Sequence, residues 1–309
     1  MREDRVEFYS EGAKVAGILR RPDGEGPFPG IVQGPGWLGL KDAKLYLPYH
    51  EAFTAAGFAV LIFDYRGFGD SEGTRETLSP SMQLEDLVNS VTYLQTRDDI
   101  LPDSIGTFGS GGTGGGNAVL HAAADRRVRC AVSQVPVADG EDWLRRMRRE
   151  SEWYEFLDRL DADRRTRVLT GAGEMVHPRE EIMIPTPERK QAAVKKDVDD
   201  KIPTSVPLRA AEAIMAYKPI EEAPKVHNLL VVAVEDDAVT PTDHAVALYQ
   251  AAAEPKKLIM QRHTTHYAAY SQHGDAVIPV MVDWYRTHLG GRAVQAITPT
   301  QIETLKENP

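Results

Sequence analysis

The sequence predicts an α/β protein with a mostly parallel central sheet, helices on both faces and one inserted helical cap. Short apolar runs alternate with helical periodicity along most of the chain, which indicates parallel strands joined by helices. The alternation fails in one place, between about residues 140 and 224. With 309 residues the chain is long enough to bury one large core and carry such an insertion.

Each expected element follows from its local pattern. Residues 6–9 and 15–19 flank the turn Glu11-Gly12 and predict an opening hairpin. Residues 58–63 are apolar throughout, which is typical of a strand covered on both faces. Further strands are expected at 30–33, 105–108, 130–135, 229–234 and 258–260, and helices at 46–56 (closed by Gly57), 84–96, 117–124 and 277–289.

The pattern divides the chain into three parts. We expect residues 1–139 and 225–290 to form the core, 140–224 a helical cap and 291–309 a C-terminal tail. The cap region is charged, interrupted by prolines and without strand signal. Aromatic residues at 143, 153, 154 and 156 stand among many Arg and Glu, which predicts helices with one apolar side. Such an insertion is expected to cover the mouth of a site.

Composition narrows the class of partner. The net charge of −10, from 46 acidic and 36 basic residues, disfavours nucleic acid and anionic membranes as partners. The first residues lack the apolar region of a signal peptide, and no run reaches the length of a membrane span. We therefore expect a cytoplasmic protein with a small-molecule substrate, and a homodimer stays open. The lone Cys130 is expected to be a buried hydrophobe, and we expect no metal or cofactor.

The run FGSGGTGGGNAV, at residues 108–119, has the form of a strand-to-helix turn with six glycines between positions 109 and 116. A turn of this kind presents the serine of a G-x-S-x-G motif above the sheet. Counting from the preceding strand places the nucleophile at Gly111, and counting back from the helix places it at Gly112. Ser110 fits only if the strand ends early and Phe108 takes a position that needs a small residue. Thr113 requires a longer strand, so we rank glycine first and Ser110 second.

Two other interpretations of this run stay open. Gly109-x-Gly111-x-x-Gly114 matches the dinucleotide fingerprint, but residues 133–136 supply no acid to hold a ribose. The run also lies far from the first βα unit, where that fingerprint belongs. The second interpretation is a tight turn without chemistry, which does not by itself need six glycines.

Five segments in chain order resemble the α/β-hydrolases of the dienelactone-hydrolase and X-prolyl-peptidase-like group. They are PGWLGLK at 35–41, FDYRGFGDSEG at 63–73, the glycine run, VEDDAVTP at 234–241 and THYAAY at 265–270. The resemblance implies an oxyanion hole with the Trp37 amide as one donor and a second donor at the glycine turn, Gly112. It implies Asp237 as the acid and His266 as the general base. The chain departs from the family at the glycine turn and at Pro35, where the family often has histidine.

The chemistry of the residues is consistent with those roles. A histidine base needs an acid that fixes its tautomer and stabilises its charged form. Asp237 and His266 both follow expected strands, at the edge where sites in open α/β sheets assemble. Glu235 and Asp236 are rival acids, and His263 is the rival base.

Three functional classes follow. The first is a hydrolase in which the His266-Asp237 pair acts directly on water or on a substrate proton, without a serine nucleophile. Its substrate is expected to be a small ester, lactone or β-diketone-like compound, cleaved at a C–O or C–C bond. The second is an ordinary serine esterase that uses Ser110. The third is an inactive or engineered form that only binds acyl compounds.

Overall fold

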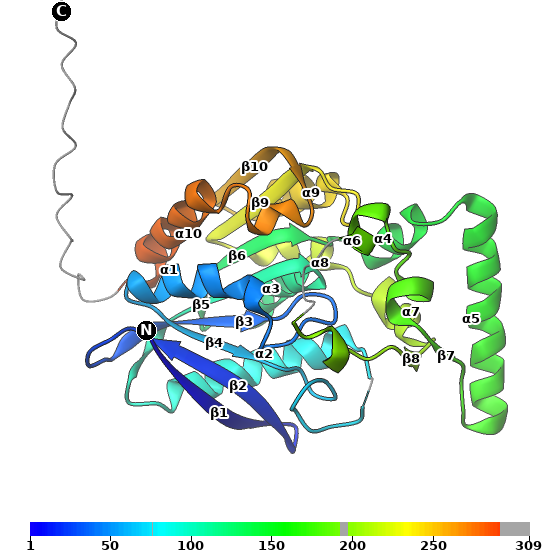
Figure 1. Ribbon diagram of the computed structural model, residues 1–309, viewed down its shortest axis with the longest axis horizontal. Coiled ribbons are helices and arrows are strands. Elements are labelled where there is room, and N and C mark those ends of the chain that lie inside the picture. The colour runs from blue at the N-terminus through cyan, green and yellow to red at the C-terminus, as the bar shows by residue number, and fades with distance from the viewer. Residues whose placement is uncertain (76, 192–196, 291–309) are drawn as a thin grey trace, which may run out of the picture.

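The protein is described by a computed structural model that covers residues 1–75, 77–191 and 197–290 (Figure 1). Within these residues, eight strands form one sheet in the order β1-β2-β4-β3-β5-β6-β9-β10. β1 and β2 form an antiparallel hairpin, and β2 pairs antiparallel with β4. The remaining neighbours are parallel. The predicted α/β fold with a mostly parallel sheet is confirmed.

The central strands are apolar and buried, as a sheet covered on both faces requires. All five residues of β4 are buried, and the first six of β9 are buried as well. The bounds are β1 Arg2–Ser10, β2 Ala13–Arg21, β3 Phe28–Gly34, β4 Ala59–Phe63, β5 Ile100–Gly112, β6 Val128–Pro136, β9 Leu229–Asp236 and β10 Lys256–Thr265.

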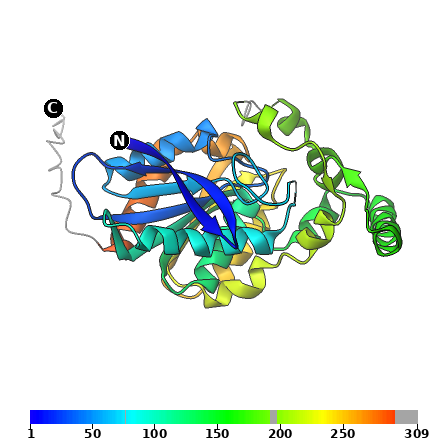
Figure 2. The same cartoon turned by 90° about the horizontal axis from the view of Figure 1, so that it is seen from below.

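Helices cover both faces of the sheet (Figures 1 and 2). α1 (Leu47–Ala55) and α10 (Gly274–Leu289) pack together on one face through Phe53 and Tyr285, whose rings meet edge to face at 5.2 Å. α2 (Pro80–Gln95), α3 (Thr113–Ala124) and α9 (Thr242–Ala251) lie on the other face. Buried side chains between these layers make the core, and Cys130 is among them, as expected.

Residues between β6 and β9 form the insertion, which is mainly helical. Its elements are α4 Gly140–Arg146, α5 Glu150–Thr170, β7 Met175–Val176, a π-turn at Pro178–Ile182, α6 Pro187–Gln191, a 3-10 turn at Asp199–Lys201, β8 Val206–Pro207, α7 Ala210–Met215, α8 Pro219–Glu222 and a 3-10 turn at Ala223–Lys225. The sequence of this region carries no strand signal, yet β7 and β8 pair antiparallel. Strands of two residues are too short to show an alternating pattern. They form a sheet of their own and add nothing to the central sheet.

The glycine run differs from its predicted boundaries. The strand expected at 105–108 extends to Gly112, and the helix expected from 117 begins at Thr113. Glycine is a weak helix former, so the sequence gives no helical signal for the first turn of α3. The predicted tail at 291–309 and the cap residues 192–196 lie outside the described residues. In the part of the chain that is described, no helix is both long and apolar enough to cross a membrane.

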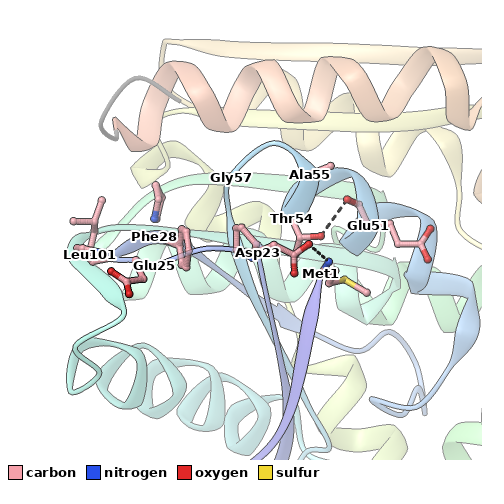
Figure 3. A pocket seen from close by; sticks show the side chains of 13 residues that line it. Met1, Asp23, Glu25, Phe28, Glu51, Thr54, Ala55, Gly57 and Leu101 are labelled. Carbon is pink, nitrogen blue, oxygen red and sulfur yellow. Dashed lines mark hydrogen bonds and ion pairs between the residues drawn. The ribbon is translucent and has the colours of Figure 1, made fainter. Parts of the chain in front are cut away.

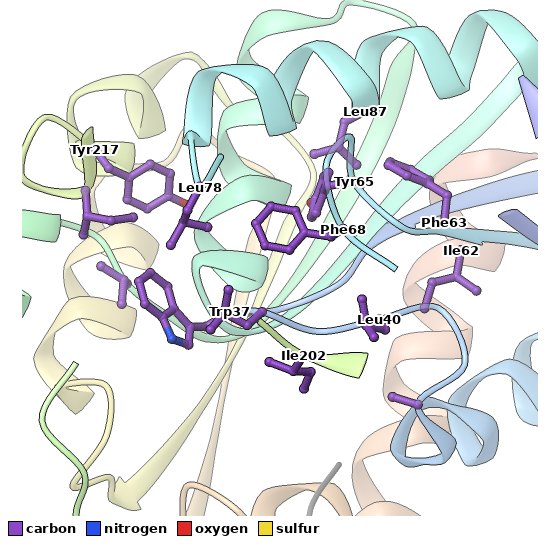
Figure 4. Close-up of a cluster of buried hydrophobic side chains, with 14 of the residues drawn as sticks. Trp37, Leu40, Ile62, Phe63, Tyr65, Phe68, Leu78, Leu87, Ile202 and Tyr217 are labelled. Atoms are coloured by element: carbon purple, nitrogen blue, oxygen red, sulfur yellow. The ribbon is translucent and has the colours of Figure 1, made fainter. Parts of the chain in front are cut away.

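Core and insertion share one hydrophobic cluster beside the glycine run (Figure 4). Trp37 and Leu40 come from the loop after β3, and Phe68 comes from the loop after β4. Ile202 and Tyr217 belong to the insertion, and both are buried in the same cluster. The insertion is therefore packed onto the loops that follow the central strands.

Candidate active site

The end of β5 and the start of α3 meet in a sharp turn that favours glycine. Gly112 has φ 58° and ψ −112°, and Gly111 has φ 82°. Residues with a Cβ rarely adopt positive φ, whereas glycine adopts it without strain. A sharp strand-to-helix turn of this kind is the one that presents the nucleophile of a G-x-S-x-G motif. Of the two predicted positions, the geometry favours Gly112, the last residue before the helix.

Two glycines of the run allow neighbouring backbone to approach closely. A Cβ atom on Gly114 would stand 2.7 Å from the Cα of Gly36, in the loop after β3. A Cβ on Gly115 would stand 2.7 Å from the carbonyl oxygen of Gln134, on β6. Real Cβ contacts are not this short, so these positions need glycine. The run thus holds the start of α3 tightly against β6 and the β3 loop.

Two further glycines make room for tyrosine hydroxyls. A Cβ on Gly116 would overlap the hydroxyl of Tyr217, which donates a 3.0 Å hydrogen bond to the Thr113 carbonyl. A Cβ on Gly111 would stand 2.8 Å from the hydroxyl of Tyr270, in the loop after β10. Gly111 is therefore closed on the side where a side chain would project.

Gly112 differs from its neighbours because the space beside it is open. A Cβ there would make only ordinary contacts, at 3.8 Å from Thr240 Cγ2 and 4.0 Å from Trp37 Cβ. Trp37 and Thr240 belong to two of the segments that carry the family resemblance. The open position therefore lies between the expected oxyanion loop and the expected acid loop.

His266 and Asp237 form a buried pair beyond the ends of β10 and β9. His266 Nδ1 lies 2.9 Å from Asp237 Oδ2 and 3.1 Å from Oδ1. The side chains are 6% and 2% exposed. Pairing through Nδ1 leaves Nε2 as the ring nitrogen that can take or give a proton. Thr240 Oγ1, 3.3 Å from His266 Nδ1, belongs to the side chain that also borders the open position at Gly112.

Asp237 is held in its charged form by several donors. Its Oδ1 accepts from the amides of Val239 and Thr240 at 2.8 and 2.7 Å, and its Oδ2 accepts from Thr240 Oγ1 at 2.8 Å. Burial alone raises the pKa of the carboxyl, but His266 and the Thr240 hydrogen bonds outweigh it and lower the pKa below its usual value of 3.8. An ionised acid at this place can orient the imidazole and stabilise its protonated form.

The rival residues lie in different surroundings. Glu235 accepts from the His263 amide at 2.9 Å and pairs with Arg262 at 2.7 Å on the surface. The His263 side chain is 92% exposed. Asp236, the last residue of β9, is exposed. Burial and hydrogen bonding thus separate His266 and Asp237 from the alternatives that the sequence left open.

Ser110 lies inside the strand. It is completely buried, it pairs with Gln134 of β6, and its hydroxyl is 3.0 Å from the Tyr270 hydroxyl. Burial raises the pKa of Tyr270 well above 10, so this hydroxyl stays neutral. The Ser110 hydroxyl is therefore buried within the strand and hydrogen-bonded to Tyr270.

The expected oxyanion donors are near the open position. The Trp37 amide makes a long, weak hydrogen bond of 3.4 Å to the Gly111 carbonyl. The Gly112 carbonyl accepts from the Val137 amide at 2.9 Å, and the first amide of α3 belongs to Thr113. Amides in the first turn of a helix have no partner within it. The turn therefore offers the Thr113 amide, one residue after the position proposed from sequence.

The FDYRGFGDSEG segment anchors the loop that carries Trp37. Asp64 accepts from both the amide and the Nζ of Lys41, at 2.8 and 2.7 Å. It also accepts from the Asp70 amide at 3.0 Å. The Lys41 and Asp64 side chains are each 1% exposed, so removing one partner would leave a buried charge. This ion pair fixes the end of the 35–41 loop beside β4.

Two residues that support the site, Thr240 and Trp143, are not predicted from the sequence. Thr240 stands in the quoted VEDDAVTP segment, but its bonds to Asp237 depend on the turn geometry. Trp143 of α4 donates from Nε1 to the Val239 carbonyl at 2.7 Å and meets the Trp37 ring edge to face at 5.5 Å. The contacts of Trp143 join distant segments, so they leave no signal in local sequence.

Cavities occur at both edges of the sheet. One, of about 550 Å³, lies between the insertion and the acid loop and is lined by Trp143, Met147, Ile184 and Val239 among others. A second, of about 830 Å³, is lined by Phe28 and Leu101 near the starts of β3 and β5 (Figure 3). Sites in open α/β sheets form at the carboxyl ends of strands, so the second cavity lies at the wrong edge for catalysis.

Known proteins resemble this chain in sequence. The family model described as X-Pro dipeptidyl-peptidase (S15 family) matches residues 11–268. An uncharacterized 31.7 kDa protein of Escherichia coli, from the traX-finO intergenic region, is 33% identical over 283 residues, which cover 91% of this chain and 97% of that protein. The thiohydrolase aneE of Aspergillus aculeatus is 35% identical over 137 residues, 43% of this chain and 42% of its own.

Solved structures share the fold at lower identity. The α/β hydrolase GrgF from Penicillium sp. sh18 superposes with a TM-score of 0.78 at 21% identity, over 94% of this chain and all of that one. The fold and these relatives define a hydrolase of the α/β-hydrolase class. Within that class, the chain belongs to the X-Pro dipeptidyl-peptidase (S15) family.

Proposed function

We propose that the protein hydrolyses a small acyl compound by general-base catalysis, with His266 and Asp237 as the base pair and no covalent acyl-enzyme. The observation that carries this proposal is the open position at Gly112. Each of the other glycines discussed is filled by a neighbour, whereas a Cβ on Gly112 would meet nothing closer than 3.8 Å. The space where a serine hydroxyl would stand is available to water.

The proposed reaction follows from the geometry. His266 Nε2 takes a proton from water, and the water oxygen forms a bond to the carbonyl carbon. The resulting oxyanion is held by the amides of Thr113 and Trp37, for which Trp37 exchanges its long bond to the Gly111 carbonyl. The intermediate collapses, the bond to the leaving oxygen or sulfur breaks, and that atom takes the proton from His266. Asp237 stabilises the protonated imidazole between these steps.

The substrate class is proposed on two grounds. The cavity between the insertion and the acid loop is partly apolar, which suits a small acyl group. The relative named a thiohydrolase adds thioesters to the esters and lactones expected from sequence. Cleavage of a β-diketone C–C bond needs the same water attack with a carbon leaving group and stays within the proposal.

The test separates the water mechanism from a serine mechanism. The protein, Ser110→Ala and Gly112→Ser are assayed against a panel of aryl esters, acyl thioesters, lactones and β-diketones. Each is also treated with a fluorophosphonate and weighed intact by mass spectrometry. We expect turnover without labelling for the protein and for Ser110→Ala, and stoichiometric labelling of Gly112→Ser. The Gly112→Ser variant reports on whether the base pair can activate a hydroxyl placed at the open position.

Three outcomes overturn the proposal. Labelling at Ser110 together with loss of activity in Ser110→Ala restores the ordinary serine mechanism. Absence of turnover on every substrate, with esterase activity appearing only in Gly112→Ser, identifies an inactive hydrolase. Absence of labelling in a folded Gly112→Ser variant shows that His266 does not face the open position.

A further inference from the structure

Helix α5 has one side that nothing in the described chain covers. It lies at the outer end of the insertion in both views, with its outer side facing away from every other element (Figures 1 and 2). Its inner side buries Trp153, Phe156 and Leu160. At 21 residues it is the longest helix that the described residues form.

A single stripe of exposed residues runs along that outer side. Its members recur at spacings of four and three residues, as in the contact seam of paired helices, and they are Tyr154, Asp158, Asp161, Arg165 and Val168. Tyr154 is 56% exposed and Val168 is 80% exposed. The neighbouring Leu169 is 83% exposed. Large apolar residues thus stand in solvent at both ends of a charged stripe.

The charges along the stripe are segregated. Asp158 precedes the central Asp161, and Arg165 follows it. Asp158 and Arg165 make no ion pair with any residue that the structure describes, although both are exposed on the same helix. This order also suits the dipole of an isolated helix. The dipole does not account for Tyr154 and Val168, which gain nothing from exposure to water.

The stripe is complementary to itself when reversed. Tyr154 and Val168 lie seven residues on either side of Asp161. In an antiparallel pair of α5 helices with a twofold axis at Asp161, Tyr154 of each copy meets Val168 of the other. Asp158 then lies one residue out of register with Arg165 of the other copy, an offset of about 1.5 Å that these side chains can span. The same contact repeats on the far side of the axis. A surface that matches itself in this way is the requirement for an isologous dimer.

We propose that the outer face of α5 is a homodimer interface whose occupant is α5 of a second copy of this chain. Asp161 approaches its own symmetry mate at the axis, which is the one repulsive contact. Arg164 Nη1 lies 3.6 Å from Asp161 Oδ1 on the same helix and supplies a compensating charge. The interface is independent of the proposed catalytic mechanism.

The length of α5 limits the affinity expected for the proposed dimer. A helix of 21 residues is roughly 30 Å long, so a pair buries less than the ~1,600 Å² of a standard interface. We therefore expect a weak dimer, with a Kd on the order of 10 μM. Charge reversal at the stripe places like charges in contact and weakens association by at least ~10-fold.

The experiment uses charge-reversed variants of the full chain in sedimentation velocity, from about 1 to about 100 μM. We expect the unchanged protein to dimerise with concentration, and Asp158→Arg and Arg165→Glu each to need at least ~10-fold higher concentration to do so. An equimolar mixture of these two variants should dimerise again, because each contact then pairs opposite charges. Asp283→Arg, an exposed reversal on α10, serves as the matched control and should dimerise like the unchanged protein.

The mixture makes the test specific for this register. A protein that stays monomeric over the whole range overturns the proposal. So does a dimer that persists in both single variants, since another surface then forms it. A mixture that fails to dimerise, while circular dichroism shows both variants folded, overturns the antiparallel pairing.

Discussion

The two sides of the candidate active site are built in opposite ways. On one side, His266 and Asp237 are placed by side-chain hydrogen bonds, and Asp237 alone accepts three bonds besides those to histidine. On the other side, the glycine turn is shaped by missing side chains, which let Gly36 and β6 press against α3. In the mechanism proposed above, His266 and Asp237 handle the proton, whereas the glycine turn has an open position at Gly112. We infer that the chemistry depends on what enters that position.

The largest expected effect on activity comes from removing the His266 side chain. His266→Ala removes the proposed proton acceptor and should decrease kcat by roughly 10²–10⁴-fold, because general-base catalysis contributes about that much. The fold should survive, since the ring occupies a loop beyond β10. The measurement is steady-state kinetics on the best substrate of the panel, with thermal unfolding as the check on folding.

His263→Ala is the matched control for this prediction. His263 stands three residues earlier, near the end of β10, and its side chain is 92% exposed. Its replacement should leave kcat within about twofold, because substitutions of exposed side chains outside the core and the site usually have small effects. An inactive His263→Ala beside an active His266→Ala would reverse the assignment of the base.

Adding a side chain to the glycine turn should destabilise the fold. Gly111→Ala places a methyl group 2.8 Å from the Tyr270 hydroxyl at a positive φ. Overpacking and backbone strain together should lower the free energy of unfolding by about 2–4 kcal/mol. Tyr270→Phe removes the hydroxyl, so the double variant should be more stable than the two single losses predict, by about 1 kcal/mol. Urea unfolding of the four proteins measures this coupling, and strictly additive losses would contradict it.

Sequence and structure contribute differently to these two sides. Apolar runs and helical periodicity predict the strands and helices of the core, because each signal is local. The acid loop and the histidine loop are recognisable from short segments at strand ends. Counting residues could not choose between Gly111 and Gly112, because both counts start from predicted element ends. In the structure β5 ends at Gly112 and α3 begins at Thr113, which differs from both predictions. The backbone angles, and the tyrosine that closes Gly111, distinguish them.

Contacts between distant segments lie beyond local patterns. The Lys41-Asp64 ion pair, the bond from Trp143 to Val239 and the Tyr217 hydroxyl over Gly116 each join segments separated by 20 or more residues. The two-residue strands β7 and β8 are likewise too short to alternate. The sequence predicts the layers of the molecule, whereas packing determines how its loops are held.

The stabilising effect of the Asp237 carboxylate should depend on pH. The folded-state pKa of Asp237 lies below its usual value of 3.8, so its carboxylate stabilises the fold at higher pH. Asp237→Asn should lower the free energy of unfolding at neutral pH by about 2 kcal/mol, the range for bonds to a charged group. The difference from the unchanged protein should shrink as pH falls through the lowered pKa, where the carboxyl becomes protonated in both states. A difference that grows below pH 3.8 would contradict the direction of the shift.

The smallest expected effect comes from replacing Trp143, which contacts both sides of the site. Trp143 touches the Trp37 ring and donates to the Val239 carbonyl, so it contacts both the oxyanion loop and the acid loop. Trp143→Phe keeps an aromatic ring but loses the donor, which should lower the free energy of unfolding by about 1 kcal/mol. Because both loops rest on this side chain, kcat should fall by up to ~10-fold with little change in KM.

Trp153→Phe distinguishes positioning from general stability. Trp153 is a buried aromatic residue of the same insertion, and its ring packs on Phe156 within α5. Its replacement should cost similar stability and leave kcat unchanged. Equal losses of kcat in both variants would mean that the insertion acts only as packing. A loss confined to Trp143→Phe would show that the insertion sets the distance between the glycine turn and the base pair.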